Sequence, residues 1–252
     1  MTQGSISFDR IADRYDETRG GERRGQHVAA QIDPFLGEAH RVLEVGVGTG
    51  VVAASLQQLG RTVVGVDISA EMLSRAHARL GSRVARADAH QLPIPTSAID
   101  AAYLVWVLHL VAEPAEVLAE CARVLRPSGR VAVITGRPRT EAEDMTEQQA
   151  ALDALRKTRR DTTDAVTEWG TAAGFEVVTR QEIEAEHWAS PAEYADVIEQ
   201  RTFSFVWDLD EATWASAVQP AIDSLRALPD PTRPRRVVHH RALLVFQKGG
   251  GA

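Results

Sequence analysis

Short apolar runs alternate with helical patterns between residues 41 and 135. The runs are rich in β-branched residues, as buried strands are, and the segments between them place apolar residues three and four positions apart. Strands are therefore expected at 41–45, 62–67, 83–88, 99–105 and 130–135. Strands that alternate with helices at this interval predict an α/β fold, a parallel, doubly wound sheet with helices on both faces.

Polar residues and glycines mark several of the expected boundaries. Ser69 is expected to cap a helix whose buried face begins at Met72. Gly60 and Gly81 are suited to end helices. The stretch "RPSG", residues 126–129, is expected to form a turn between a helix and the fifth strand.

The two ends of the chain follow other patterns. Residues 8–37 have a helical pattern, and residues 137–173 are polar and largely helical. Runs at 175–185 and 235–248 read as two further strands, which makes the predicted sheet seven-stranded and mostly parallel. The intervening segment, 186–234, is too long for a hairpin turn and carries helical stretches. We expect it to form a helical cap inserted before the last strand, over the substrate site.

Composition narrows the classes of partner. The chain has 252 residues, 44% of them hydrophobic, and a formal net charge of -7, which disfavours broad nucleic-acid binding. It has no apolar run near the roughly 18 residues that span a bilayer, and its first residues lack a secretory pattern. We expect a cytoplasmic protein, a monomer or homodimer, that binds no membrane and no nucleic acid. The single cysteine, Cys121, is expected in the core, and no metal-ligand spacing is found, so no metal is predicted.

The stretch "VLEVGVGTG", residues 42–50, runs from the first predicted strand into a glycine-rich loop that opens a helix. Open α/β sheets bind ligands at this place. Gly46, Gly48 and Gly50 have G-x-G-x-G spacing, which differs from the G-x-G-x-x-G dinucleotide fingerprint. A P-loop is excluded because no lysine follows Gly50.

Three carboxylates accompany the loop. Glu44 precedes it, and a carboxylate there suits a positively charged ligand better than a pyrophosphate. Asp67 ends the second predicted strand, where a carboxylate can accept hydrogen bonds from both hydroxyls of a ribose. Asp88 ends the third strand. The three therefore predict an acidic, sugar-compatible rim at one edge of the sheet.

Four stretches in order resemble the successive motifs of class I S-adenosylmethionine-dependent methyltransferases, in the small-molecule branch called methyltransferase type 11 or UbiE-like. They are "VLEVGVGTG", "VVGVDISAEML", "ARADAHQLPIPTSAIDAAYLVWVLHLV" and "RVLRPSGRVAVIT". The N-terminal segment "FDRIADRYDETRG" is similar to the segment that closes over the cofactor in that branch. The resemblance covers about residues 8–135. It implies a single Rossmann-like domain over 1–252, an N-terminal helical flap over 1–37, and S-adenosyl-L-methionine as cofactor, with S-adenosyl-L-homocysteine as product.

The resemblance also implies which residues hold the cofactor. The methionine portion and methyl group would lie near Glu44, Gly46, Gly48, Gly50, Val105 and Trp106, under a flap that supplies Tyr15 and Arg19. The ribose and adenine would lie near Asp67, Ile68, Met72, Asp88 and Ala89. Some of these residues have simpler readings: Met72 as core, Asp88 as the cap of a turn, and Tyr15 and Arg19 as residues that pin a helix to the domain.

Substrate residues are less clearly marked. His109 is the candidate general base: family members often carry two histidines here, and this chain matches only the first. A packed, structural histidine is the alternative reading, and His187, His239 and His240 are lesser candidates for the base. Aromatic residues of the cap could form its own core or line the site. We expect the substrate to contact Tyr15, His109, Trp188, Tyr194 and Arg201.

These observations predict methyl transfer to a small-molecule acceptor by in-line displacement. One alternative is a methyltransferase-fold protein of secondary metabolism that catalyses another reaction, such as cyclisation. Another is a non-catalytic cofactor-binding module, which the complete set of Glu44, glycines and Asp67 disfavours. An NAD-dependent dehydrogenase is disfavoured by the loop spacing.

Overall fold

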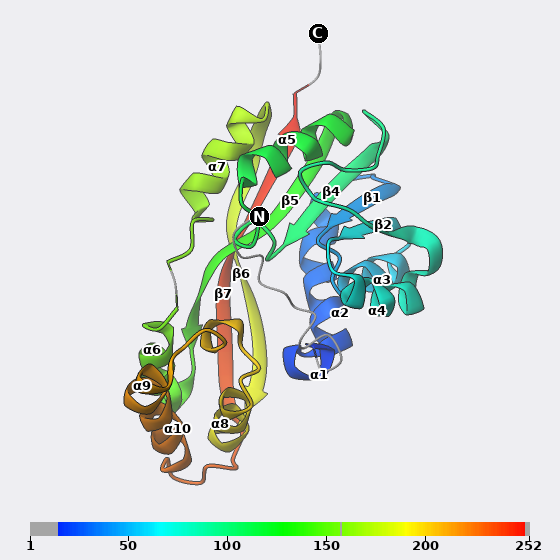
Figure 1. The fold of residues 1–252 in the computed structure, drawn as a ribbon. Coiled ribbons are helices and arrows are strands. Elements are labelled where there is room, and N and C mark those ends of the chain that lie inside the picture. The colour runs from blue at the N-terminus through cyan, green and yellow to red at the C-terminus, as the bar shows by residue number, and fades with distance from the viewer. Residues whose placement is uncertain (1–14, 157, 250–252) are drawn as a thin grey trace. The chain divides into compact units, whose positions relative to one another are not determined.

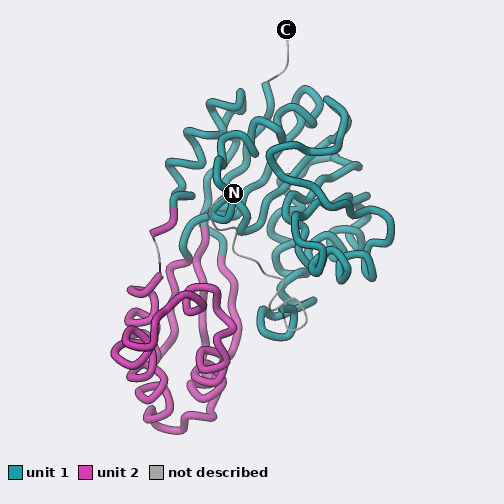
Figure 2. The backbone as a smooth tube through the Cα atoms, viewed as in Figure 1, with its two compact units in different colours: residues 1–137, 160–183, 242–252 teal, residues 138–159, 184–241 magenta. Residues whose placement is uncertain are grey.

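The computed structural model describes residues 15–156 and 158–249. The first 14 residues of the expected flap thus lie outside the described part of the chain. The chain forms two compact units, coloured separately in Figure 2. Unit 1 comprises residues 1–137, 160–183 and 242–252, and unit 2 comprises 138–159 and 184–241.

A seven-stranded sheet, in the order β3-β2-β1-β4-β5-β7-β6, organises the described chain (Figure 1). The strands are β1 (Arg41–Val45), β2 (Thr62–Asp67), β3 (Val84–Arg86), β4 (Ile99–Val105), β5 (Leu125–Glu141), β6 (Phe175–Ala189) and β7 (Arg235–Lys248). Strands β1 to β5 pair in parallel. Strands β5 and β6 run from unit 1 into unit 2, whereas β7 runs back, so β7 is the antiparallel member. The predicted α/β, mostly parallel seven-stranded fold is confirmed.

Helices cover both faces of the sheet in unit 1. They are α1 (Tyr15–Arg19), α2 (Gly21–Ile32), α3 (Val51–Gln58), α4 (Ala70–Leu80), α5 (Pro114–Val124) and α7 (Thr163–Ala172), with short 3₁₀ turns at Asp33–Phe35 and Gly81–Arg83. Successive β1 residues point to opposite faces: Val42 packs with residues of α2, α3 and α4, and Leu43 packs with residues of α5 and α7. Cys121 is fully buried in the second of these cores, as expected.

Unit 2 has a core of its own. Its helices are α6 (Thr146–Asp153), α8 (Pro191–Glu199), α9 (Glu211–Thr213), a π-helical turn (Trp214–Val218) and α10 (Gln219–Arg226), with 3₁₀ turns at Glu143–Met145 and Ser204–Val206. Residues of α6, α8 and α10 share one apolar cluster. The buried Arg235 side chain donates to Asp144 from the other segment of the unit. The expected cap, 186–234, lies within this unit, which also includes 138–159.

Most boundaries agree with the sequence pattern, and Ser69 does cap α4 by accepting the Met72 N–H. The expected turn at 126–129 is wrong. These residues form an irregular part of β5, because the strand pairs with β4 at Leu125 and again from Arg130 onward. The strand also continues to Glu141, into a stretch expected to be helical, since the sheet extends there into unit 2.

Candidate functional site

The glycine loop leaves open space at one of its three glycines. A Cβ at Gly46 would lie 2.4 Å from Val107 Cγ2, and one at Gly50 would lie 3.0 Å from Leu80 Cδ1. At Gly48, which has a φ of +53°, no atom lies within 4 Å of the Cβ position. Packing therefore requires a glycine at 46, and the space at Gly50, whose φ is +79°, is tight. Gly48 borders space that a ligand can approach along bare backbone.

Glu44, on β1 just before this loop, is buried with 3% of its surface exposed. Burial raises the pKa of its carboxyl to about 8, and the negative charge of Asp67 adds to the rise. The Tyr103 hydroxyl donates to Glu44 Oε2 at 2.8 Å, and Arg24 attracts the carboxylate; both oppose the rise in pKa. Near neutral pH the carboxyl therefore holds its proton, and a bound cation would favour the ionised form. Tyr103 was not identified from the sequence, because a buried tyrosine in a strand reads as core.

Asp67, at the end of β2, joins two loops at the carboxyl edge of the sheet. Its Oδ2 accepts the Gly48 N–H at 2.8 Å, and its Oδ1 accepts the Ser69 N–H at 2.9 Å. A carboxylate oxygen can accept more than one hydrogen bond. The Asp67 carboxylate is thus held in place by backbone N–H groups at the edge where a ribose is expected.

The residues expected near an adenine lie on the same edge. Ile68 is 57% exposed, whereas Met72 is 3% exposed and lies in the protein interior. The His90 backbone N–H, at 2.9 Å from Asp88 Oδ1, and the His90 ring lower the pKa of the exposed Asp88 carboxyl. Asp88 therefore does cap its own turn, and it also presents a carboxylate to solvent. Ala89 is partly buried against the core.

Helix α1 is fastened to the glycine loop by Asp16. Its Oδ1 accepts the Thr49 hydroxyl at 2.6 Å, and its Oδ2 accepts Arg79 Nη2 at 2.7 Å. Arg79 also donates to the Thr49 carbonyl oxygen at 2.9 Å. Sequence reasoning singled out Tyr15 and Arg19 in this helix and missed Asp16, although it stands next to Tyr15 in the same motif.

An arginine of α2 lies between two aromatic rings. The Arg24 guanidinium carbon is 5.3 Å from the Tyr15 ring centroid and 4.9 Å from that of Trp106, and Arg19 lies 6.0 Å from the Tyr15 ring. Trp106 directly follows β4 and has a φ of +58°, which is unusual for a bulky residue and typical of functional sites. Val105, the last residue of β4, packs partly buried beside it. Arg24 has no sequence signal; only the fold brings it to Trp106.

His109 follows in the segment after β4. Its Nδ1 lies 4.0 Å from Oδ2 of Asp161, a fully buried residue from the loop before α7. Asp161 was missed because it lies 52 positions away in a stretch without a motif. The site residues of unit 1 thus come from the carboxyl ends of β1, β2, β3 and β4 and the segments that follow them, and from α1 and α2.

The other proposed substrate residues belong to unit 2. The Tyr194 ring packs edge-on against Phe203 at 6.0 Å, and the Arg201 guanidinium lies 4.1 Å from the Trp214 ring. Trp188 is 61% exposed. Tyr194 and Arg201 therefore contact the unit's own aromatic residues, as in the simpler of the two readings. Their contact with substrate stays a prediction.

The lesser histidine candidates also lie in unit 2. The rings of His187 and His239 stack at 5.1 Å, and Thr140 Oγ1 lies 2.9 Å from His239 Nδ1. Burial and, to a smaller extent, nearby cations lower the pKa of His239 to about 3. His240 points to the other strand face and lies between Glu141 and Glu184. A histidine of such low pKa is a weak base at neutral pH.

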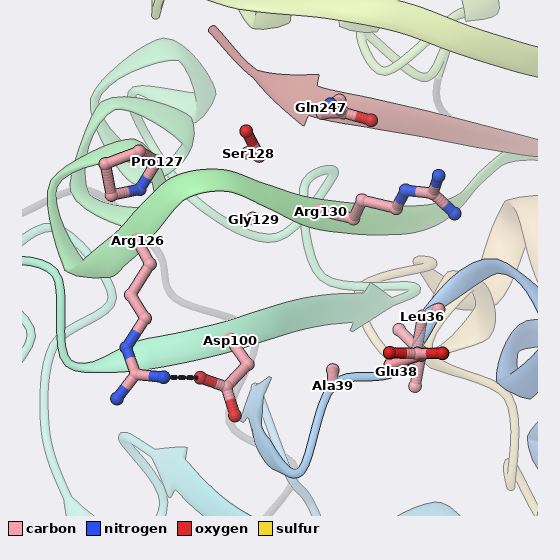
Figure 3. A pocket seen from close by; sticks show the side chains of 11 residues that line it. Leu36, Glu38, Ala39, Asp100, Arg126, Pro127, Ser128, Gly129, Arg130 and Gln247 are labelled. Carbon is pink, nitrogen blue, oxygen red and sulfur yellow. Dashed lines mark hydrogen bonds and ion pairs between the residues drawn. The ribbon is translucent and has the colours of Figure 1, made fainter. Parts of the chain in front are cut away.

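A cavity of about 500 Å³ lies at the opposite, amino edge of the strands in unit 1 (Figure 3). It is lined by Leu36, Gly37, Glu38, Ala39, Asp100, Arg126, Pro127, Ser128, Gly129, Arg130 and Gln247. Arg126 is directed at Asp100, 2.5 Å away, and Asp100 also accepts the backbone N–H groups of His40 and Arg41. Its polar groups hold the start of β1, so this cavity has a structural explanation.

Within residues 15–156 and 158–249, no three or more His, Cys, Asp or Glu residues form a group that could hold a metal ion. Over the same described residues, no helix has the length and apolar character needed to cross a membrane.

Comparison with known proteins finds similarity to methyltransferases. Residues 43–133 match the family described as methyltransferase domain. An uncharacterised methyltransferase of Mycobacterium tuberculosis is 28% identical over 236 residues, which cover 90% of this chain and 92% of that protein. A demethylmenaquinone methyltransferase of Clavibacter sepedonicus is 33% identical over 141 residues, 52% of this chain and 57% of that one.

Solved structures share the fold. The (4+2)-cyclase SpnF has a TM-score of 0.62 at 20% identity and covers 97% of this chain and 94% of its own. The phosphoethanolamine N-methyltransferase 2 of Haemonchus contortus, solved with phosphomonomethylethanolamine and S-adenosylhomocysteine, has a TM-score of 0.57 at 18% identity, over 96% of this chain and 58% of its own. At such identities the likeness concerns the fold alone. The match of the domain and of the curated relatives confirms the resemblance seen in the sequence to methyltransferases of the type 11 or UbiE-like branch.

Proposed function

We propose that the protein transfers the methyl group of S-adenosyl-L-methionine to a small-molecule acceptor. The observation that carries the proposal is the open backbone at Gly48, whose N–H donates to Asp67 in the loop that follows the buried Glu44. A ligand in that space meets a carboxyl that favours a cation on one side and a carboxylate that accepts hydroxyl protons on the other. The methyltransferase relatives support the same assignment.

The residues present fit this cofactor. Glu44 would take the ammonium group of its methionine portion, and the guanidinium groups of Arg24 and Arg19 beside Tyr15 suit the carboxylate. Arg24 Nε is buried and has no hydrogen-bond partner among the described residues, which leaves a donor for such a group. Asp67 would hold the ribose hydroxyls.

The adenine end of the site has both an apolar and a polar side. The exposed Ile68 side chain would pack on the base, and Met72 would support it from the interior. Asp88 would accept from the amine, and Ala89 would offer its backbone. The bound cofactor supplies an electrophilic methyl on a sulfonium, which leaves as a thioether.

The chain's own work is positioning and proton transfer. The ring of Trp106, with Arg24 and Tyr15, would cover the methionine end and exclude water from it. His109 would accept a proton from the acceptor where the nucleophile carries one. A small molecule is the acceptor we propose because the net charge of -7 disfavours nucleic acid. Tyr15, Trp188, Tyr194 and Arg201 are the proposed lining residues. A cytoplasmic location and a monomeric or homodimeric state complete the proposal.

Methyl transfer can be tested without knowing the acceptor. The purified protein is incubated with a cell extract and cofactor labelled in its methyl group, and labelled small molecules are separated and identified. We expect a labelled product with wild type and with Glu38→Gln, an exposed carboxylate at the far edge of the sheet. Asp67→Ala should lose most of the label. Failure of the wild-type protein to bind the cofactor in calorimetry would overturn the proposal.

The same experiment separates methyl transfer from a cyclase-like reaction. The cyclase SpnF shares the fold with this chain. Tight cofactor binding without any S-adenosylhomocysteine, in extracts that contain a consumed substrate, would favour a reaction of that kind. Accumulation of S-adenosylhomocysteine in proportion to labelled product supports methyl transfer.

A further inference from the structure

Asp161 is a buried carboxylate beside the middle of β5, at Thr135 and Gly136. The whole Asp161 residue is 0% exposed. The Thr135 hydroxyl lies 2.6 Å from its Oδ2 and 2.9 Å from its carbonyl oxygen, and the Gly136 N–H donates to Oδ2 at 3.4 Å. An ionised carboxylate in the interior is costly unless it meets donors and a positive charge. The hydrogen bonds to Thr135 and Gly136 supply the donors.

His109 supplies the charge when protonated. Its Nδ1 faces Asp161 Oδ2 at 4.0 Å, and its side chain is 23% exposed, against 1% for that of Asp161. One side of the imidazole thus faces a buried acid, while the ring is still partly accessible. Catalytic contacts are often long before the ligands bind, so the 4.0 Å separation is compatible with a hydrogen bond in the loaded site.

The segment that carries His109 is fastened to the loop that carries Asp161. Arg160, the neighbouring cation on that loop, donates to the Ala112 carbonyl oxygen at 2.6 Å and to that of Val111 at 3.3 Å. The Leu110 N–H closes a turn onto the Val107 carbonyl oxygen at 2.8 Å. These contacts fix the backbone on both sides of the imidazole, so the pairing of His109 with Asp161 is built into the fold of unit 1.

We propose that Asp161 is the positioning residue for His109: it orients the imidazole through Nδ1, so that Nε2 is unprotonated and directed at the acceptor. The inference rests on the proposed function. The acceptor's lone pair forms the bond to the methyl carbon as the carbon–sulfur bond breaks, with that electron pair going to sulfur. The acceptor's proton passes to Nε2, and Asp161 stabilises the imidazolium that results.

The first test uses the wild-type protein without cofactor. Nitrogen-15 NMR of the imidazole rings, with the His109 signals assigned by their loss in His109→Gln, reports which nitrogen carries the proton in the neutral form. We expect the Nδ1–H tautomer, because Asp161 accepts at that side. Free neutral histidine favours Nε2–H, so finding Nε2–H at His109 would overturn the proposal, and no variant needs to fold for this result.

The second test titrates His109 in Asp161→Asn, with Asp164→Asn as the matched control. Asp164 is nearby in sequence, at the start of α7, and its side chain is 88% exposed. Removing an opposite charge within about 4–6 Å should lower the proton affinity of the imidazole by at least about tenfold. A change in Asp161→Asn no larger than in Asp164→Asn would count against the proposal. Thermal denaturation shows whether the first variant is folded.

Turnover adds a third readout once labelled product is available. In Asp161→Asn, kcat should fall, and the limb of the pH profile in which kcat rises with pH should move to lower pH. The KM for the cofactor should be unchanged. If the wild type transfers no methyl group, the proposed function fails, whereas the tautomer and titration results still decide whether Asp161 positions His109. The two failures are therefore distinguishable.

Discussion

Cofactor binding should release a proton from Glu44. Burial raises the pKa of this carboxyl to about 8 in the ligand-free protein, so at pH 7 it is about nine-tenths protonated. An ammonium group beside it favours the ionised form, and the proton must then leave. We expect release of roughly 0.9 proton per site at pH 7, and of roughly 0.1 at pH 9, where the carboxyl has already ionised.

Calorimetry measures this release directly. Binding heats of the cofactor are compared in phosphate and Tris at the same pH, because the two buffers take up protons with different enthalpies. Glu44→Gln should abolish the release at pH 7 and weaken binding, since the amide cannot ionise. Glu38→Gln, on an exposed residue away from the site, should behave as wild type. The difference between wild type and Glu44→Gln isolates Glu44 from the ligand's own amine.

A wild-type release near zero at pH 7 would refute the reasoning. It would mean either that the carboxyl is already ionised without cofactor or that no cation comes to rest beside it. Equal release in wild type and Glu44→Gln would assign the proton to another group. Release that does not decline between pH 7 and pH 9 would exclude a group with a pKa of about 8.

Three further predictions concern the glycine loop and the two carboxylates beside it. Folding raises the Glu44 pKa from 4.5 to about 8, so the folded state binds this proton more tightly than the unfolded state. The free energy of unfolding therefore falls as pH rises through that window, by about 3 kcal/mol at pH 7. Urea unfolding at pH 5 and pH 8 should show this fall in wild type and not in Glu44→Gln. Gly46→Ala should lower the unfolding temperature more than Gly48→Ala, because only the first places a Cβ 2.4 Å from a Val107 methyl, and equal losses would contradict the packing argument. Asp67→Ala should weaken cofactor binding by about 1–3 kcal/mol in calorimetry, the scale for leaving buried polar partners unmet, and unchanged affinity would remove Asp67 from the site.

Local pattern was enough to predict the parallel half of the sheet. Strands β1, β2 and β4 begin and end where the apolar runs do, because most of their residues are buried. The position of Glu44 and Asp67 at one edge follows from the same reasoning, since parallel strands place their carboxyl ends together. The placement of these carboxylates at one edge of the sheet could therefore be predicted from local sequence pattern.

Local sequence pattern did not predict the contacts between residues that are distant in the sequence. Asp16 meets Arg79, 63 positions away, and Asp161 meets His109 from a loop with no motif. Nothing periodic marks such residues, because each is chosen by a partner that only the folded chain brings close. The prediction of a turn at 126–129 was wrong for a related reason. The glycine and proline of this stretch are typical of a turn, but pairing with β4 on either side holds it within a strand as a bulge.

The chain crosses between the two units at 137/138, 159/160, 183/184 and 241/242. Three of these crossings fall inside strands β5, β6 and β7. Unit 2 is therefore not an insertion that could be exchanged by cutting the chain at two loops. A chimera that exchanged it for the corresponding part of a relative would have to cut three strands and restore the side-chain alternation of each, since a shift of one residue turns every side chain to the other face. Substitutions on the helices of unit 2, by contrast, leave these three strands intact.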